Sequence, residues 1–428
     1  MESAETAVLP SLSLFDLPYI QSAITDTQYI DVNPLTTISD GVIEFSYTNH
    51  RAFLALDRSY LHMEFKVTLP NGDAIPAGAQ IAVAQHIGST ACKQMMLYLN
   101  GKLVCDSGPL YAYRSYIAVE FGHSTATRSS LFEPGGYYYD EQPGIAGDGY
   151  TKRKELVEGS KVCGVMAPLF LDICQQPRVM LNFVDLRLQV FMNENSFILE
   201  GYPWQLPNPA YKLQLIGCKL KLKEIFLHDT VTLAIEKLLQ QEKRIQYPHT
   251  ATLVRSTYIT GGRYSTPDVH VLTNRIPNRI LFGFVKPQNY NGSYSTSPFV
   301  FEHANVRAIS VQVGSTVIPC KPWRIDFAGD NFVEAYTNTL ESLNVMSSGQ
   351  DIGLSMKKWK NTHCLHAFNL SPATDTDLVD LIRRGNTTLK IDFSVAVPAE
   401  GYYLITYVQN NAILSLDASR EPVVDSIV

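Results

Sequence analysis

The stretch MLYLNGKLVCDSGPLYAYRSYI, residues 96–117, reads as a strand, a tight turn at Gly101, a second strand and a tyrosine-rich segment. A similar order occurs in ISVQVGSTVIPCKPWRIDF, residues 309–327, where Gly314 takes the turn position. In both stretches the short second run ends near a cysteine, and a proline and aromatic residues follow. The two glycines lie almost half of the 428-residue chain apart, so the pattern indicates a structural unit that is used twice.

Two further pairs of segments follow the same order. MEFKVTLPNG (63–72) matches LFGFVKPQNYNG (281–292), and VMLNFVDLRLQV (179–190) matches TLKIDFSVAV (388–397), with Asn182-Phe183 opposite Asp392-Phe393. Because the spacing between partners is nearly constant, we interpret the chain as one all-β unit in tandem. Each half has room for about eight strands and long loops, which is the inventory of a jelly roll.

Strict alternation of apolar and polar residues, as in Met63-Glu-Phe-Lys-Val67, predicts half-buried antiparallel strands and not a parallel sheet. In residues 211–224 the apolar set shifts by one position between Leu215 and Cys218, which predicts a β-bulge. Residues 228–248 have an apolar stripe at helical spacing that includes Leu239, and we expect Pro248 to end this helix.

These observations predict an all-β fold of two tandem antiparallel jelly rolls joined by a short helix. The expected divisions are an N-terminal arm, a first jelly roll, a connector helix, a second jelly roll and a C-terminal tail, at residues 1–30, 31–227, 228–248, 249–411 and 412–428. Both terminal segments fall outside the repeat, and we expect them to become ordered mainly through neighbouring subunits.

Composition excludes several classes of protein. With 45% hydrophobic and 18% charged residues the chain can bury a large core, and a net charge of −6 argues against a broad basic face for nucleic acid. No apolar run is long enough to span a membrane, and the N-terminus lacks the basic region of a secretory signal. Seven cysteines without a C-x-x-C pair indicate reduced, mostly buried thiols in an intracellular protein.

We find no motif for catalysis. GSTACK (88–93) lacks the residues of a phosphate loop, and no G-x-S-x-G elbow occurs. His363 and His366 in HCLH face opposite sides of a strand, so we interpret them as packing residues and not as metal ligands. The acidic pair Asp140 and Glu141 lies in a loop without an evident apolar pocket. We therefore predict no catalytic, cofactor-binding or metal-binding residues, and no enzyme activity.

The segment FEPGGYYYDEQPGIAGDGYTKRK, residues 132–154, is an insertion dense in glycine and tyrosine. Its aromatic content favours a loop that docks on another surface. We expect its basic strip, Lys152 to Lys154, to be solvated. We expect Tyr137 to Tyr139 and the aromatic residues of QNYNGSYSTSPFVF (288–301) to be buried between subunits, because exposed aromatic area would be costly in a free monomer.

Taken together, the chain resembles the double jelly-roll major capsid proteins of the Polinton/Maverick and adintovirus group, which are related to virophage and adenovirus capsid proteins. The resemblance covers roughly residues 40 to 425. Its motifs are DGVIEFSYTNHRAFLALDRSYLHMEFKVTLPNG, LNGKLVCDSGPLYAYRSYI, PRVMLNFVDLRLQVFMNENSFIL, YPHTATLVRSTYITGG, RIPNRILFGFVKPQNYNGSYSTSPFVFEHANV, GSTVIPCKPWRIDF and LIRRGNTTLKIDFSV.

The resemblance implies a structural function. Three subunits would form a pseudo-hexameric capsomer, and capsomers would tile the icosahedral shell of a double-stranded DNA virus, so the chain would be found in the virion after assembly inside the host cell. The implied partners are further copies of the chain and penton or minor capsid proteins, without a cofactor, specific recognition of nucleic acid or a membrane-spanning segment.

Other classes of protein share this strand pattern. A host-encoded, domesticated capsid-like protein and a lectin-like jelly-roll binding protein remain alternatives. An enzyme of the cupin type would need a cluster of histidine and carboxylate ligands, which the sequence does not present. Two measurements separate these possibilities. A trimer is expected for a capsid protein, whereas saturable sugar binding is expected for a lectin.

Overall fold

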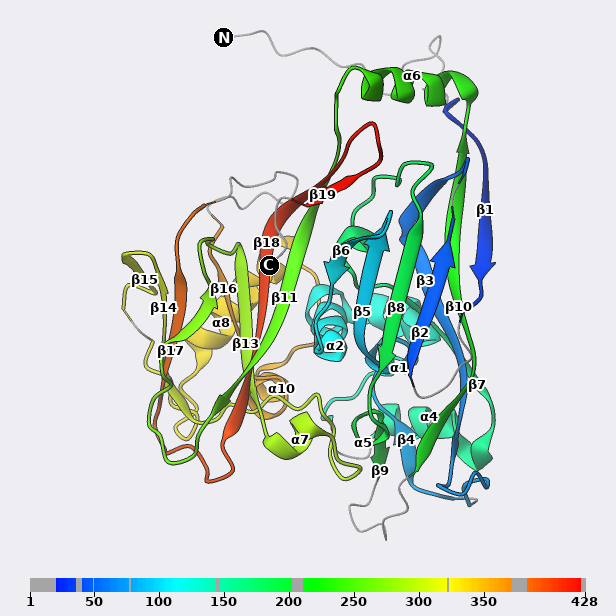
Figure 1. The fold of residues 1–428 in the computed structure, drawn as a ribbon. Helices are drawn as coiled ribbons and strands as arrows, with labels where there is room; N and C mark the ends of the chain where they lie inside the picture. Colours follow the sequence, from blue (N-terminus) through cyan, green and yellow to red (C-terminus); the bar gives the residue numbers. More distant parts are fainter. Residues whose placement is uncertain are drawn as a thin grey trace, which may run out of the picture.

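The computed structural model describes residues 21–35, 41–48, 50–76, 78–143, 147–201, 211–321, 323–371 and 383–424. Its strands form two β-sandwiches that stand side by side (Figure 1). The first sandwich comes from the N-terminal half of the chain, blue to green in the figure, and the second from the C-terminal half, green to red. The two sandwiches are the antiparallel jelly rolls that the sequence predicts, so the fold class is confirmed.

Two four-stranded sheets make the first jelly roll, with the orders β1-β10-β3-β7 and β2-β8-β5-β6. Alternating apolar residues such as Phe45 and Phe65 are buried in its core. The predicted bulge is confirmed, because the register of β10 against β3 shifts between Leu215 and Gly217. The strands are β1 Ile24–Val32, β2 Val42–Tyr47, β3 Phe53–Thr68, β5 Cys92–Leu99, β6 Lys102–Asp106, β7 Cys163–Pro168, β8 Leu186–Met192 and β10 Lys212–Leu227, with a separate pair β4 Ile81–Val83 and β9 Leu199–Gly201.

The second jelly roll repeats this plan, with the orders β11-β18-β13-β16 and β12-β17-β14-β15. When the main strands of each roll are counted along the chain, the first pairs with the eighth, the eighth with the third and the third with the sixth in both rolls. The strands are β11 Ile245–Ile259, β12 Val269–Leu272, β13 Arg279–Val285, β14 Val306–Val313, β15 Thr316–Ile318, β16 Leu365–Asn369, β17 Thr387–Phe393, β18 Tyr402–Leu416 and β19 Pro422–Val424, which pairs with β18.

The repeated hairpins occupy equivalent places in the two rolls. The first hairpin joins β5 to β6 through Asn100 and Gly101, whose φ angles of 47° and 76° match the turn that Asn-Gly favours between antiparallel strands. The second joins β14 to β15, and Gly314 adopts a φ of 59° there. This part of the repeat is therefore confirmed.

The third match identifies the right strands, β8 and β17, but its residue alignment is wrong. Leu99 pairs with Leu186 in the first roll, and Val313 pairs with Thr387 in the second. Asn182-Phe183 consequently precede β8, whereas Asp392-Phe393 end β17. Period-two alternation fits several alignments of the two strands equally well, so the sequence alone could not decide which residues are equivalent.

The connector segment contains a helix, α6 Asp229–Gln240, which is shorter than expected. Pro248 does not end it, because Pro248 lies inside β11. The strand β11 is at the edge of its sheet and pairs only with β18, so a residue without an N–H group is tolerated there.

Both ends of the chain also differ from expectation. Residues 24–30, predicted as part of an arm, belong to β1 and pair with β10, and residues 412–416, predicted as tail, belong to β18. Most of β1 is exposed on both faces, so its sequence lacks the alternation that would have revealed it. The remaining arm residues 1–20 and 425–428 lie outside the described part of the chain.

In each roll a helical insertion separates the hairpin from the next strand. The insertion between β6 and β7 contains α2 Tyr111–Gly122, α3 Thr125–Leu131, η2 Glu133–Gly135, α4 Asp148–Glu155 and η3 Glu158–Ser160, and that between β15 and β16 contains α8 Val333–Ser342, α9 Val345–Ser348 and α10 Met356–Asn361. The other helices are α1 Ile87–Thr90, η4 Asp172–Gln175, α5 Asn195–Ile198 and α7 Pro287–Asn291. Among the helices described, none has the length and apolar content required to cross a membrane.

Candidate functional site

Buried aromatic and charged side chains gather where the two jelly rolls meet, a region that we call the junction. The helix α2 of the first insertion lies between the rolls in Figure 1. Its Tyr116 ring stacks on Phe299 at a centroid distance of 4.3 Å, and its Tyr113 meets Phe299 edge to face at 5.7 Å. The Tyr113 hydroxyl donates to the Pro298 carbonyl at 3.0 Å. All three rings are buried, so apolar burial from both rolls holds the junction together.

A carboxylate on α2, Glu120, sits at the centre of the junction. Lys358 Nζ of α10 donates to Glu120 Oε1 at 3.0 Å, and His363 Nε2 lies 3.4 Å from the same oxygen. The Tyr137 hydroxyl donates to Glu120 Oε2 at 2.8 Å, and Arg128 forms an ion pair with it. Lys358 and His363 belong to the second insertion, so one buried carboxylate connects the two rolls.

The electrostatics of Glu120 follow from these partners. Burial alone would raise the pKa of Glu120, but the positive charges of Lys358 and Arg128 outweigh it and hold that pKa well below its usual value. Burial lowers the pKa of His363. A buried carboxylate with this number of donors stabilises one arrangement of the rolls, because any displacement would leave a charge unpaired.

The described parts of this loop, residues 132–143 and 147–154, find their partners within the chain, which corrects two expectations. Arg153 is buried and not solvated, and it forms ion pairs with Asp140 at 2.5 Å and Glu200 at 3.2 Å. Tyr137 is 2% exposed within the single chain. The sequence did not show that these groups would pair, because their partners are distant along the chain.

The segment 288–301 also finds its partners within the chain. Phe299 and Phe301 are fully buried, and Tyr290 stacks on Tyr403 at a centroid distance of 3.9 Å. Burial of these aromatic residues therefore does not require a second subunit. The expectation that these residues are buried between subunits is therefore wrong.

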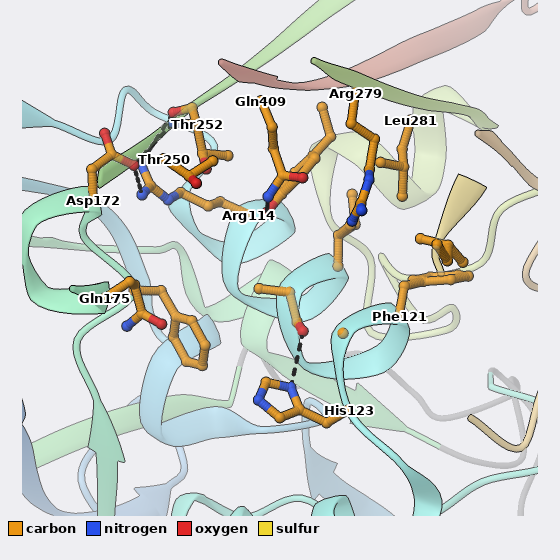
Figure 2. A pocket seen from close by; sticks show the side chains of 16 residues that line it. Arg114, Phe121, His123, Asp172, Gln175, Thr250, Thr252, Arg279, Leu281 and Gln409 are labelled. Carbon is orange, nitrogen blue, oxygen red and sulfur yellow. Dashed lines mark hydrogen bonds and ion pairs between the residues drawn. The ribbon is translucent and has the colours of Figure 1, made fainter. Parts of the chain in front are cut away.

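A cavity of about 210 Å³ opens beside α2 at the junction (Figure 2). One wall comes from the first roll and includes Arg114 on α2 and Asp172 on η4, which form an ion pair. The opposite wall comes from the second roll, where Thr252 donates its N–H to Asp172 at 2.9 Å and accepts from Arg114 at 3.2 Å. Further lining residues are Phe121, His123, Gln175, Thr250, Arg279, Leu281, Tyr407 and Gln409.

The predicted packing role of the HCLH histidines agrees with their separate surroundings. His363 contacts Tyr116 and Glu120, whereas His366 packs edge-on against Trp359 at 5.3 Å. Within the part of the chain that the structure describes, no three potential metal ligands gather at one place. Six of the seven cysteines are buried free thiols, as expected, and Cys320 is exposed.

Sequence reasoning missed the charged residues of the junction. Arg114 and Glu120 are the only charges in YAYRSYIAVEF, residues 111–121, which is otherwise rich in aromatic and apolar residues. Isolated charges in such a segment are a signal for buried ion pairs, since an unpaired buried charge is costly. Asp172 carries the same signal, because it is the only charge in VMAPLFLDIC, residues 165–174, whereas Lys358 stands in the polar stretch SMKKWKN, residues 355–361, and carries none.

The fold is similar to that of double jelly-roll capsid proteins of several viruses. A chain of the Sputnik virophage structure matches with a TM-score of 0.67 at 12% identity, covering 99% of this chain and 93% of the other. The mavirus major capsid protein matches with a TM-score of 0.58 at 11% identity, covering 99% and 96%. At these identities the similarity establishes the double jelly-roll fold.

Among sequences, no family model matches the chain. The uncharacterized protein F54H12.2 of Caenorhabditis elegans is 30% identical over 428 residues, which is 96% of this chain and 100% of the nematode protein. Identity of this extent over nearly the whole length indicates common descent, and the chain belongs to the same family as this nematode protein.

Proposed function

We propose that the chain is a major capsid protein whose homotrimers form the pseudo-hexameric capsomers of an icosahedral double-stranded DNA virus of the Polinton/Maverick and adintovirus group. The observation that carries the proposal is the identical strand order of two jelly rolls that one buried junction holds in a fixed arrangement. The similarity of the whole chain to the virophage and mavirus proteins supports it.

The geometry suits such a shell for a physical reason. A trimer of a duplicated unit contains six similar jelly rolls, so a three-fold object presents a nearly hexagonal outline that packs among six neighbours. This outline persists only if the two rolls do not move relative to each other. The aromatic layer and the Glu120 cluster supply that rigidity in each subunit.

The remaining parts of the proposal follow from this role. The protein acts as a structural component of the virion and not as an enzyme. Its partners are neighbouring capsomers and penton or minor capsid proteins, and it is assembled inside the host cell.

The decisive measurement is the mass of the purified protein by light scattering after size-exclusion chromatography. We expect a trimer of about three times the subunit mass of 47.8 kDa, with or without reductant and chelator. Electron microscopy of the same fraction should show three-fold particles with a near-hexagonal outline. A stable monomer at micromolar concentration would contradict the capsomer.

A second candidate is a host-encoded, domesticated capsid-like or lectin-like protein. The animal origin of the 30% identical relative favours it, because a nematode encodes that protein. Under this alternative, expression would give monomers or small oligomers that bind a sugar saturably and form no shells. A glycan-binding assay beside the microscopy distinguishes the two.

A further inference from the structure

We propose that the junction cavity of Figure 2 is a binding site for a small oxyanion of the phosphate or sulfate class, held by Arg279. The site is independent of capsid assembly, and the observations below do not depend on it.

Within the part of the chain that the structure describes, Arg279 is a cation without a side-chain partner. It is the first residue of β13, and its backbone pairs with Asn369 and Gln409. Its side chain is half-buried and points into the cavity from the second roll (Figure 2). No described residue forms an ion pair or a side-chain hydrogen bond with its guanidinium group. Burial lowers the pKa of Arg279, as expected for a cation that nearby carboxylates do not compensate.

The rest of the lining leaves this charge unbalanced. Among the described residues that line the cavity, Asp172 is the only carboxylate, and Arg114 together with the Thr252 N–H occupies it. Figure 2 shows Asp172 and Arg279 on opposite sides of the cavity, with Arg114 between them. The wall therefore has two guanidinium groups and one carboxylate, and the unmatched positive charge is at Arg279.

Polar groups near Arg279 can complete the coordination of an anion. Among the described residues, the Gln409 side-chain amide has a single, long contact of 3.4 Å from Nε2 to the Tyr407 hydroxyl, and Thr250 lies on the same wall. His123 lines the cavity from the first roll, and its Nδ1 lies 3.2 Å from the Ala118 carbonyl. Arg279, Gln409 and Thr250 come from three strands of one sheet, β13, β18 and β11, and all three residues line the cavity.

The size and chemistry of the space favour an oxyanion. A volume of about 210 Å³ exceeds what a single water needs and accommodates a phosphate with part of its hydration shell. The planar fork of an arginine matches two oxygens of a phosphate or sulfate. An apolar ligand would leave the charge of Arg279 without solvent or partner, which is unfavourable.

The test measures unfolding midpoints of the full chain in sodium phosphate and in sodium chloride at matched pH and ionic strength. Wild type is compared with Arg279→Gln, and Arg255→Gln on β11, an edge strand of the same sheet, serves as the control because its side chain is exposed. We expect phosphate to raise the midpoint of wild type and Arg255→Gln but not that of Arg279→Gln. In chloride, Arg279→Gln should be at least as stable as wild type, since it removes an uncompensated charge.

Equilibrium dialysis with radiolabelled inorganic phosphate gives the binding directly. Wild type should bind about one phosphate per chain, and Arg279→Gln should bind at least about tenfold more weakly. Equal stabilisation of wild type and Arg279→Gln by phosphate would overturn the site. Wild-type protein that binds no labelled phosphate would also overturn the site. An Arg279→Gln protein that does not fold in chloride would overturn it as well, because the arginine would then be required for the structure of the empty cavity.

Discussion

At the scale of single residues, Glu120 has the largest number of partners at the junction, and it connects both rolls. Glu120→Gln would leave Lys358 and Arg128 buried without a counter-charge, so we expect a loss of about 3–5 kcal/mol in the free energy of unfolding. The exposed pair of Lys102 and Glu421 provides a matched control, and Glu421→Gln should cost less than about 1 kcal/mol. Urea unfolding curves measure both, and equal small losses would show that the buried cluster contributes little.

Two buried histidines predict how stability depends on pH. Burial lowers the pKa of His86 and of His366 from 6.5 to about 3. In the unfolded chain both rings bind a proton below about pH 6.5, while in the folded chain they stay neutral, so the unfolded state binds more protons. Stability is therefore greatest above pH 6.5 and falls as the pH is lowered towards 3, by about 1.4 kcal/mol per pH unit for each histidine.

Substitution separates this effect from packing. Between pH 6.5 and 5, His366→Gln should reduce the slope of unfolding free energy against pH by the contribution of one histidine, while the other shifted histidines still contribute. Phe282→Leu, which trims the aromatic neighbour of His366, should lower stability equally at every pH and keep the slope. A His366→Gln slope equal to that of wild type would contradict the assignment.

At the scale of elements, the β5–β6 hairpin requires glycine at position 101 because of its backbone conformation, and not because a side chain would lack space there. A side chain at Gly101 would meet no atom within 4 Å, but its φ of 76° is unfavourable for other residues. Gly101→Ala should therefore destabilise the protein by about 1–2 kcal/mol. Gly122→Ala, at the end of α2, has equal space and no positive φ, and should be neutral or stabilising by at most about 1 kcal/mol. Thermal unfolding of both variants tests this, and equal effects would disprove it.

The local sequence of α2 does not indicate that this segment is a helix. YAYRSYIAVEF contains aromatic and β-branched residues that favour strands, and its apolar residues do not form a distinct stripe at helical spacing. Ten residues of this helix are buried, so it lacks the polar face by which an amphipathic helix is recognised. Packing between the two rolls, and not intrinsic propensity, decides its structure.

At the scale of the whole molecule, the junction and not the connector should hold the rolls together. If a protease site replaces residues 232–236 in α6 and is cleaved, the two fragments should still elute as one species in size-exclusion chromatography, because the contacts of Tyr116 with Phe299 and of Glu120 with Lys358 remain. The cleaved Glu120→Gln protein should separate at a lower urea concentration. Fragments of the wild type that separate in buffer would show that the connector is required.

The sequence by itself determined the class of the fold and its duplication, because period-two alternation and glycine turns are local signals that recur in the same order in both halves. Tertiary structure decided which residues of β8 and β17 are equivalent in the two rolls, the membership of β1 in a sheet and the helix α2. It also decided the junction, since Glu120 meets Lys358, and Arg114 meets Asp172, only after the chain has folded. Pairing between residues distant along the chain depends on packing, and no local pattern encodes it.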